Sequence, residues 1–189
     1  MPAYQYNLTH GVSLPQDSGY LILSSLSQKF PFVHGAPLIQ IAPVRGARTR
    51  NPAFLRTDRS SVLHIRGITE VQAQGMENQW VNLLGTPLQL QSLRKIEMEP
   101  SETLVSRLVI LKDIVDPEHF LEVLKTAYPG AAVALGRRRT LAIKGLKHIG
   151  YATVLSKLTK EQALSLLENG LGKHTSMGCG TFYKGSPKF

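Results

Sequence analysis

The most informative stretch of this sequence for the fold is GLGKHTSMGCG, residues 170–180. It places four glycines among eleven residues, between an expected helix and an expected short strand. Because glycine has no Cβ atom, such a stretch leaves backbone N–H groups accessible to a phosphate, and Lys173 adds a positive charge. It lacks the GK[ST] end of a Walker A loop and does not join a strand to a helix, which excludes both common nucleotide motifs. A phosphate-contacting loop and a flexible connector both remain open.

The segments upstream of this stretch predict alternating strands and helices over the second half of the chain. Asp116 before Pro117 is a strong helix start, because Asp caps the first turn and Pro fits its first position. Thr159 with Gln162 forms a capping box that opens the next helix. We place a turn at Gly136–Arg139. The second half thus reads roughly β-α-β-β-α-β, with its elements at 104–114, 117–128, 131–135, 140–144, 149–155, 159–168 and 181–183.

The first half of the chain predicts the same order of elements. A helical spacing of apolar residues favours helices at 20–30 and 70–84, although Gly75 weakens the second. Short apolar runs favour strands at 4–8, 38–44, 62–65, 88–90 and 96–98. We expect an exposed basic loop at 45–59. The chain is therefore predicted to be α+β, with two β-α-β-β-α-β units at residues 1–99 and 100–189.

The composition favours a nucleic-acid partner. The 189 residues include 22 Lys and Arg against 13 Asp and Glu, a formal net charge of +9, and 42% are hydrophobic, enough for a folded core. The lone Cys179 excludes an intrachain disulfide and cysteine-rich zinc modules. No apolar run reaches the length of a membrane span, and the N-terminus lacks the pattern of a secretory signal. We therefore expect a cytoplasmic protein with no membrane partner.

A helix, the G-L-G-x(5)-G-C-G pattern and an aromatic strand together resemble the RAMP superfamily of CRISPR systems, in particular its Cas-six type endoribonucleases, which process CRISPR repeat RNA. The segments Ser106–Val109, Arg139–Gly145, Gly19–Tyr20 and Pro31–His34 are similar to the same family. The resemblance covers most of the chain and is most specific over 104–183. It implies a prokaryotic protein with two tandem ferredoxin-like, RRM-like units and a glycine-rich loop near the C-terminus.

The resemblance also implies an activity. Members of the family cut pre-crRNA without metal or cofactor: the ribose 2′-OH attacks the adjacent phosphate and leaves a 2′,3′-cyclic phosphate and a 5′-OH. Such a reaction needs a base, an acid and a cation at the phosphate. The implied partners are a CRISPR repeat stem-loop, whose 3′ part can stay bound after cleavage, and other CRISPR effector-complex subunits.

Histidine suits both proton transfers because its pKa lies near neutrality. By the resemblance, His34 takes the catalytic place just after the first helix, with Tyr20 as the candidate second group and His174 as the runner-up. From position alone His34 could equally be a surface turn residue, and Tyr20 a helix-packing residue. His10 ranks next after His174 for catalysis, and three other histidines are expected to be structural or solvent-facing: His64, His119 and His148. No spacing of His, Asp or Glu predicts a metal site.

Two arginine clusters and the glycine-rich stretch are the candidate RNA-binding regions. Arginine holds phosphate through paired N–H groups and stacks on bases, so both clusters suit an RNA stem, although solvated basic loops are common. The candidates in the clusters and beside them are Arg45, Arg48, Arg50, Arg56, Arg59, Arg137, Arg138, Arg139 and Lys144. Those in the glycine-rich stretch are Gly170, Gly172, Lys173, His174, Ser176, Gly178 and Gly180.

Two other functions fit much of the same pattern. A catalytically silent relative would bind crRNA as a structural subunit and leave repeat RNA whole. A ferredoxin-like RNA-binding protein outside CRISPR would share the fold and the basic charge. An ordinary RRM is disfavoured because no strand carries its aromatic stacking pattern.

Overall fold

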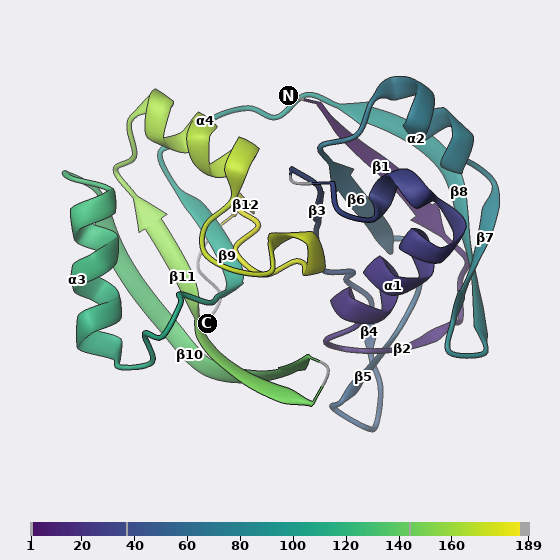
Figure 1. Ribbon diagram of the computed structural model, residues 1–189, viewed down its shortest axis with the longest axis horizontal. Helices are drawn as coiled ribbons and strands as arrows, with labels where there is room; N and C mark the ends of the chain where they lie inside the picture. The colour runs from purple at the N-terminus through teal and green to yellow at the C-terminus, as the bar shows by residue number, and fades with distance from the viewer. Residues whose placement is uncertain (1, 37, 144, 186–189) are drawn as a thin grey trace. The chain divides into compact units, whose positions relative to one another are not determined.

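The computed structural model describes residues 2–36, 38–143 and 145–185, which form an α+β fold with three antiparallel sheets (Figure 1). This confirms the expected class. The four helices are α1 (Gly19–Lys29), α2 (Glu70–Met76), α3 (Pro117–Ala127) and α4 (Lys160–Asn169). Two short 3-10 turns are η1 (Pro31–Val33) and η2 (Thr175–Met177).

The chain divides into two compact units, Met1–Glu97 and Met98–Phe189. The first unit contains a five-stranded sheet in the order β3-β6-β1-β8-β7. Its strands are β1 (Ala3–Leu8), β3 (Gln40–Ile41), β6 (Val62–Arg66), β7 (Gln79–Leu83) and β8 (Thr86–Ile96). The first strand of the unit is central in this sheet, and β7 forms one edge.

Alternating side chains give the first sheet one apolar face. Tyr4, Tyr6 and Leu8 point from β1 into a core that also contains Ile22 and Leu26 of α1. α1 and α2 cover this face of the sheet (Figure 1). The buried Tyr6 hydroxyl donates to the Ala73 carbonyl oxygen of α2 at 2.9 Å, which satisfies the one polar atom that this side chain brings into the core.

The expected helix at 70–84 is wrong beyond its second turn. α2 opens with a capping box at Thr69 and ends at Met76, and Asn78 takes a left-handed conformation with φ 60°. The chain then reverses into β7, where Val81 and Leu83 alternate into the core. A period of two replaces the expected helical period there, and Trp80 is exposed rather than packed. The strand expected at 88–90 is part of β8, whereas the strand expected at 96–98 is wrong beyond its first residue, because β8 ends at Ile96.

The expected basic loop at 45–59 contains two strands. β4 (Ala47–Arg48) and β5 (Phe54–Arg56) pair with each other, and β5 also pairs with β2 (Ser13–Pro15), which gives a three-stranded sheet. The buried Leu14 and Leu55 lie opposite each other in this sheet and join the core of the unit. The packing of these two apolar residues in the core orders the basic segment, while its arginines stay exposed.

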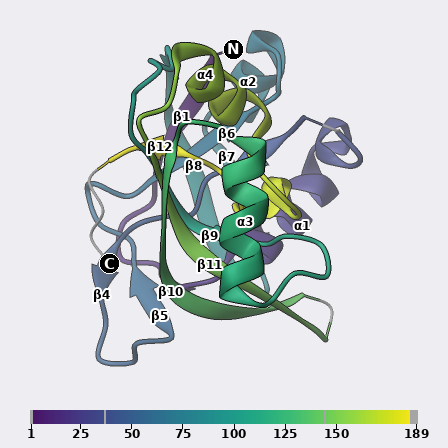
Figure 2. The same cartoon turned by 90° about the vertical axis from the view of Figure 1, so that its left-hand side faces the viewer.

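The second unit follows the expected order of elements. Its four-stranded sheet runs β10-β11-β9-β12 in space, with β9 (Leu104–Val109), β10 (Ala132–Ile143), β11 (Leu146–Ser156) and β12 (Tyr183–Lys184). α3 and α4 lie on one face of this sheet (Figure 2) and share a core with it that contains Phe120, Leu155 and Leu166. The Asp116 side chain accepts from the His119 N–H, and Thr159 with Gln162 completes the capping box, so both expected helix starts are confirmed.

The turn expected at Gly136–Arg139 is wrong. β10 runs without interruption through these residues, with a bulge between Leu135 and Arg138. The hairpin closes instead between Ile143 and Leu146. Glycine and arginine at 136–139 are typical of a turn, but here a bulge accommodates the extra residue and the pairing with β11 continues. The strand expected at 104–114 ends at Val109.

Candidate functional site

The glycine-rich loop, residues 170–180, is tied to the edge of the second sheet by backbone hydrogen bonds. It starts at Gly170, the C-cap of α4, and closes on itself where the Leu171 N–H donates to the Gly180 carbonyl oxygen at 2.9 Å. The Lys173 N–H donates to the Ile110 carbonyl oxygen at 2.8 Å, and the Gly180 N–H to that of Leu108 at 2.6 Å. These bonds extend the ladder beyond β12, so the structure does not support a flexible connector.

Two glycines of the loop are required by close backbone contact. A Cβ atom at Gly172 would lie 2.2 Å from the Ile110 carbonyl oxygen, and one at Gly180 would lie 1.8 Å from that of Leu171. Both residues also have positive φ values, 82° and 63°. The glycines therefore let the loop pack against β9, which differs from the expectation that they leave the backbone bare for phosphate.

The outer part of the loop does present free donors. The N–H groups of Thr175 and Ser176 belong to the first turn of η2, and within the described residues no acceptor is found for either. Lys173 is exposed beside them. These donors and this charge form the part of the loop that can contact a phosphate.

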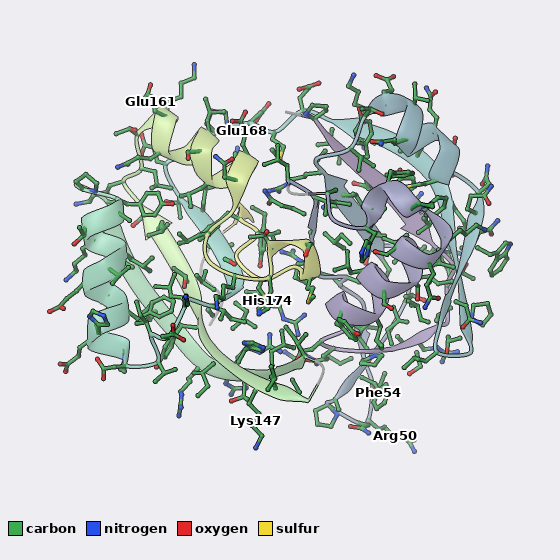
Figure 3. All side chains as sticks on the ribbon, in the orientation of Figure 1. Arg50, Phe54, Lys147, Glu161, Glu168 and His174 are labelled. Atoms are coloured by element: carbon green, nitrogen blue, oxygen red, sulfur yellow. The ribbon has the colours of Figure 1, made fainter. Side chains whose placement is uncertain are left out.

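His174 is held in an unusual environment inside the loop. Its backbone is left-handed, with φ 65°, and its carbonyl oxygen accepts from the N–H groups of Met177 and Cys179. Its Nε2 atom is buried and has no hydrogen-bond partner in the described part of the chain. Burial first, and then the charges of His148 and Lys173, hold the pKa of His174 below its usual value. The imidazole is thus neutral at neutral pH and can accept a proton or a hydrogen bond. Figure 3 shows His174 on the loop.

His148 is a candidate residue that sequence reasoning missed. It was expected to be structural, in a hairpin turn, but it lies within β11 opposite Leu141. Its ring meets that of His174 edge to face, with centroids 4.5 Å apart. Two residues further on, a Cβ atom at Gly150 would lie 2.1 Å from the Val109 carbonyl oxygen, so glycine is required beside His148 on this face. The only sign of this in the sequence is the spacing His148-x-Gly150, because residues two apart in a strand share a face and a glycine there indicates close packing.

His34 has the opposite surroundings. It follows η1, where Pro31 occupies the first position and the His34 N–H donates to the Pro31 carbonyl oxygen at 3.1 Å. Val33 is buried, and the rings of Phe30 and Phe32 pack 5.9 Å apart, which fixes the turn from within. The imidazole itself is exposed. The structure therefore places His34 in an ordered turn just past α1, with its ring open to a ligand.

Tyr20 and two of the serines of α1, Ser24 and Ser25, are less available to RNA than His34. Tyr20 is half-buried at the start of α1 and His34 follows its end; a helix of 11 residues is about 16 Å long. No hydrogen bond joins the Tyr20 hydroxyl to the His34 ring among the described residues. Ser25 is buried, and its hydroxyl donates to the Asn82 carbonyl oxygen of β7, so it is not free to contact RNA. Ser24 is half-buried.

The arginine clusters lie one in each unit. All five arginines of the first cluster are exposed: Arg45, Arg48, Arg50, Arg56 and Arg59. Arg56 donates to the Gly11 carbonyl oxygen at 3.3 Å, and Figure 3 shows Arg50 and Phe54 near the connection of β4 to β5. In the second cluster Arg137 and Arg138 are exposed and Arg139 is half-buried. Lys144 lies outside the described residues.

The described residues contain neither a candidate metal-binding cluster nor a candidate membrane-spanning helix. No group of three or more His, Cys, Asp or Glu side chains that could hold a metal ion is found among them. None of their helices is long and apolar enough to cross a membrane.

Comparison with known proteins identifies the family. The model of the Cas6 CRISPR family matches residues 4–186. The chain belongs to the Cas6 family. The CRISPR-associated endonuclease Cas6 of Myxococcus xanthus is 30% identical over 179 residues, which cover 91% of this chain and 76% of that protein. The expected membership in the CRISPR-associated RAMP proteins is confirmed.

Solved structures show a Cas6-like fold at low sequence identity. A RAMP protein described as binding different RNA substrates aligns with a TM-score of 0.69 at 12% identity, over 96% of this chain and 98% of that one. A Cas6-related protein of Pyrococcus furiosus aligns with a TM-score of 0.66 at 13% identity, over 96% and 97%. Cse3 of Thermus thermophilus, bound to an RNA representing a pre-cleavage complex, aligns with a TM-score of 0.56 at 12% identity, over 96% and 97%.

Proposed function

We propose that this Cas6 family member is an endoribonuclease that cleaves CRISPR repeat RNA, and so converts pre-crRNA to mature crRNA. The observation that carries the proposal is the family match over residues 4–186, together with a relative named as an endonuclease at 30% identity. A net charge of +9 and two exposed arginine clusters supply the positive surface that an RNA substrate needs.

We infer that both units are ferredoxin-like, with the catalytic histidine in residues 1–99 and the glycine-rich RNA-binding loop in residues 100–189. In the second sheet the order β10-β11-β9-β12 places the first and third strands of the unit side by side in the centre, as this fold requires. The order β3-β6-β1-β8 in the first sheet is equivalent, and β7 is an additional edge strand. The small sheet β2-β5-β4 is a further addition to the first unit.

The proposed reaction needs no metal or cofactor. The 2′-OH of the nucleotide before the cut attacks the neighbouring phosphorus, its proton passes to a base, and the 5′-oxygen leaves with a proton from an acid. The products are a 2′,3′-cyclic phosphate and a 5′-OH. We assign a proton transfer to the exposed imidazole of His34, which stands on an ordered turn. Tyr20 stays the candidate second group, and His174 stays the alternative proton carrier.

The RNA is proposed to be held by both arginine clusters and by the glycine-rich loop. Exposed guanidinium groups bind phosphates without reading sequence, so they position the stem rather than select it. In the loop, the free N–H groups of Thr175 and Ser176 and the charge of Lys173 support contact with one phosphate. The close packing of Gly172 and Gly180 on β9 and on the loop itself keeps these donors in place.

Incubation of the purified protein with the repeat RNA of its host, in EDTA and in magnesium, followed by a denaturing gel, tests the proposal. We expect the same cut in both buffers, and no cut when the ribose before the scissile phosphate is replaced by deoxyribose. A cut that disappears in EDTA and returns with magnesium contradicts the mechanism. An RNA that is bound but left whole assigns the chain to the silent, crRNA-binding relatives.

A further inference from the structure

Trp80 is the only tryptophan of the chain, and its side chain is 50% exposed. It lies on β7, directly before two residues of the hydrophobic core: Val81 is buried, and so is Leu83. Because successive side chains of a strand point to opposite faces, Trp80 points away from the helices, onto the outer face of the first sheet. The half-exposed indole ring offers an apolar face for stacking and an N–H donor to a ligand.

Three cross-strand pairs on this face combine Trp80 with polar residues, none of which is an acid. The register of the strands places Trp80 opposite Gln89, Asn7 opposite Gln91, and Gln5 opposite Arg94. We call the surface formed by these six residues the outer platform. Asn7 and Arg94 are exposed, and the three glutamines are half-buried. For the Arg94 guanidinium no ion pair with an acid is found in the described part of the chain.

The amides of the outer platform are held in a defined arrangement. The Gln91 Nε2 donates to the Gln89 Oε1 at 3.1 Å, and the Gln89 Nε2 donates to the Asn78 carbonyl oxygen at 3.3 Å. Gln5 contacts the His64 Nε2 through its Oε1 at 3.0 Å. Such tethered amides offer donors and acceptors at fixed places, which is what hydrogen bonding to the edges of unpaired bases requires.

We propose that the outer platform is a second RNA-binding surface, for two or three single-stranded nucleotides, in which Trp80 stacks on a base and Arg94 holds a phosphate. Arg94 is the fifth residue after Gln89 on β8, about 16 Å along the strand, a span suited to the two or three bases that RRM-type sheets bind. Only an unpaired base can expose the π-face that Trp80 needs, so the ligand is single-stranded.

The chemistry of the surface favours RNA over a protein partner. Apart from Trp80, the outer platform consists of four amides and one guanidinium group, whereas a stable protein interface needs an apolar centre. The positive charge of Arg94 and of the chain as a whole complements a polynucleotide. The inference rests on the RNA-binding part of the proposed function and not on the cleavage step.

Because Trp80 is the single tryptophan, its emission reports on this surface alone. We would titrate the full chain with an eight-nucleotide oligouridine and an eight-nucleotide oligoadenosine, unrelated to the repeat, and follow tryptophan fluorescence. The expected result is saturable quenching by a single strand and none by a matched RNA duplex. Emission that stays constant while the single strand binds, or equal quenching by the duplex, overturns the proposal.

Variants measured by anisotropy of a labelled oligonucleotide provide the second readout. Trp80→Ala should weaken binding about 5- to 100-fold, the range that follows from losing one stacked base, while Trp80→Phe keeps most of the affinity. Arg94→Ala should lower the salt slope of binding by about one. The control variant Lys125→Ala removes an exposed charge of α3 outside the candidate RNA-binding regions and should leave Trp80 quenching unchanged. If Trp80→Ala leaves the affinity unchanged, the proposal for the outer platform is wrong even where the protein cleaves repeat RNA. If single strands quench Trp80 but repeat RNA is not cleaved, the outer platform is supported and the proposed enzymatic activity is not.

Discussion

The two histidines proposed for chemistry occupy contrasting surroundings. His34 stands exposed on a turn that Pro31 and the buried Val33 make rigid. His174 sits in a loop that closes against β9 only because glycine stands at 172 and 180, and its ring rests against His148. A rigid turn presents a side chain to a ligand, whereas close loop packing changes the chemistry of the side chain that it encloses.

Replacing His34 tests the exposed member of this pair and should have the largest effect. We expect His34→Ala to slow cleavage of repeat RNA about 100-fold or more, the scale of losing a general acid or base. RNA affinity should change only a few-fold, because arginine contacts dominate binding. Single-turnover rates and filter binding provide the two numbers. Normal cleavage by His34→Ala with an inactive His174→Ala would move the proton transfer to the loop.

The packing of the loop is tested by adding one methyl group. Gly180→Ala introduces a Cβ atom that would lie 1.8 Å from a carbonyl oxygen, so the loop must shift or open. We expect a loss of about 2 kcal/mol or more in unfolding free energy, in the range of overpacking, measured by chemical denaturation. Gly130→Ala is the matched control, because Gly130 has φ 83° but open space around its Cβ position. Equal losses for both variants would mean that backbone strain, not close packing, makes glycine necessary.

The neutral state of His174 predicts a dependence of stability on pH. Its pKa is lowered in the folded protein, mainly by burial, so the unfolded chain binds the proton more tightly. The contribution of neutral His174 to the free energy of unfolding is therefore complete above the ordinary histidine pKa of about 6.5. It is lost as the pH falls through that value toward the lower pKa of the folded state. Thermal melts at pH 7.5 and pH 5 should show a smaller acid-induced drop in His174→Asn than in the wild type.

Asparagine suits this test because it tolerates the left-handed backbone of residue 174. His64, whose pKa is also lowered by burial and by Arg66 and Arg45, contributes to the acid-induced drop in both proteins and cancels in the comparison. An identical drop in wild type and variant would show that the pKa of His174 does not differ between the folded and unfolded states.

Variants of the two arginine clusters should have the smallest effect on RNA binding, and they compare the two units directly. The double variant Arg137→Ala, Arg138→Ala in β10 should lower the salt slope of repeat RNA binding by one to two, with an unchanged melting temperature, because both side chains are exposed. Arg48→Ala with Arg50→Ala is the counterpart in the first unit. Salt titrations of the two double variants show which cluster contacts more phosphates. If neither slope changes, both clusters are solvated surface that does not contact the RNA.

Local signals in the sequence determined the class of the protein and most of its elements. The caps at Asp116 and Thr159 satisfy helix N–H groups with neighbouring side chains, so the starts of α3 and α4 are visible from a few residues. The turn that carries His34 is equally local, since Pro31 and Val33 shape it. The family resemblance rests on the same kind of short pattern.

Only the tertiary structure decided the end of α2, the path of β10 and the surroundings of His174. Residues 77–83 leave the helix because Val81 and Leu83 find a sheet neighbour in β8, and residues 136–139 stay extended because β11 pairs with them. The contact of His148 with His174 joins residues 26 positions apart, through the packing of a loop on β9. Burial and the close approach of distant backbone depend on the whole unit, so no short stretch of sequence could specify them.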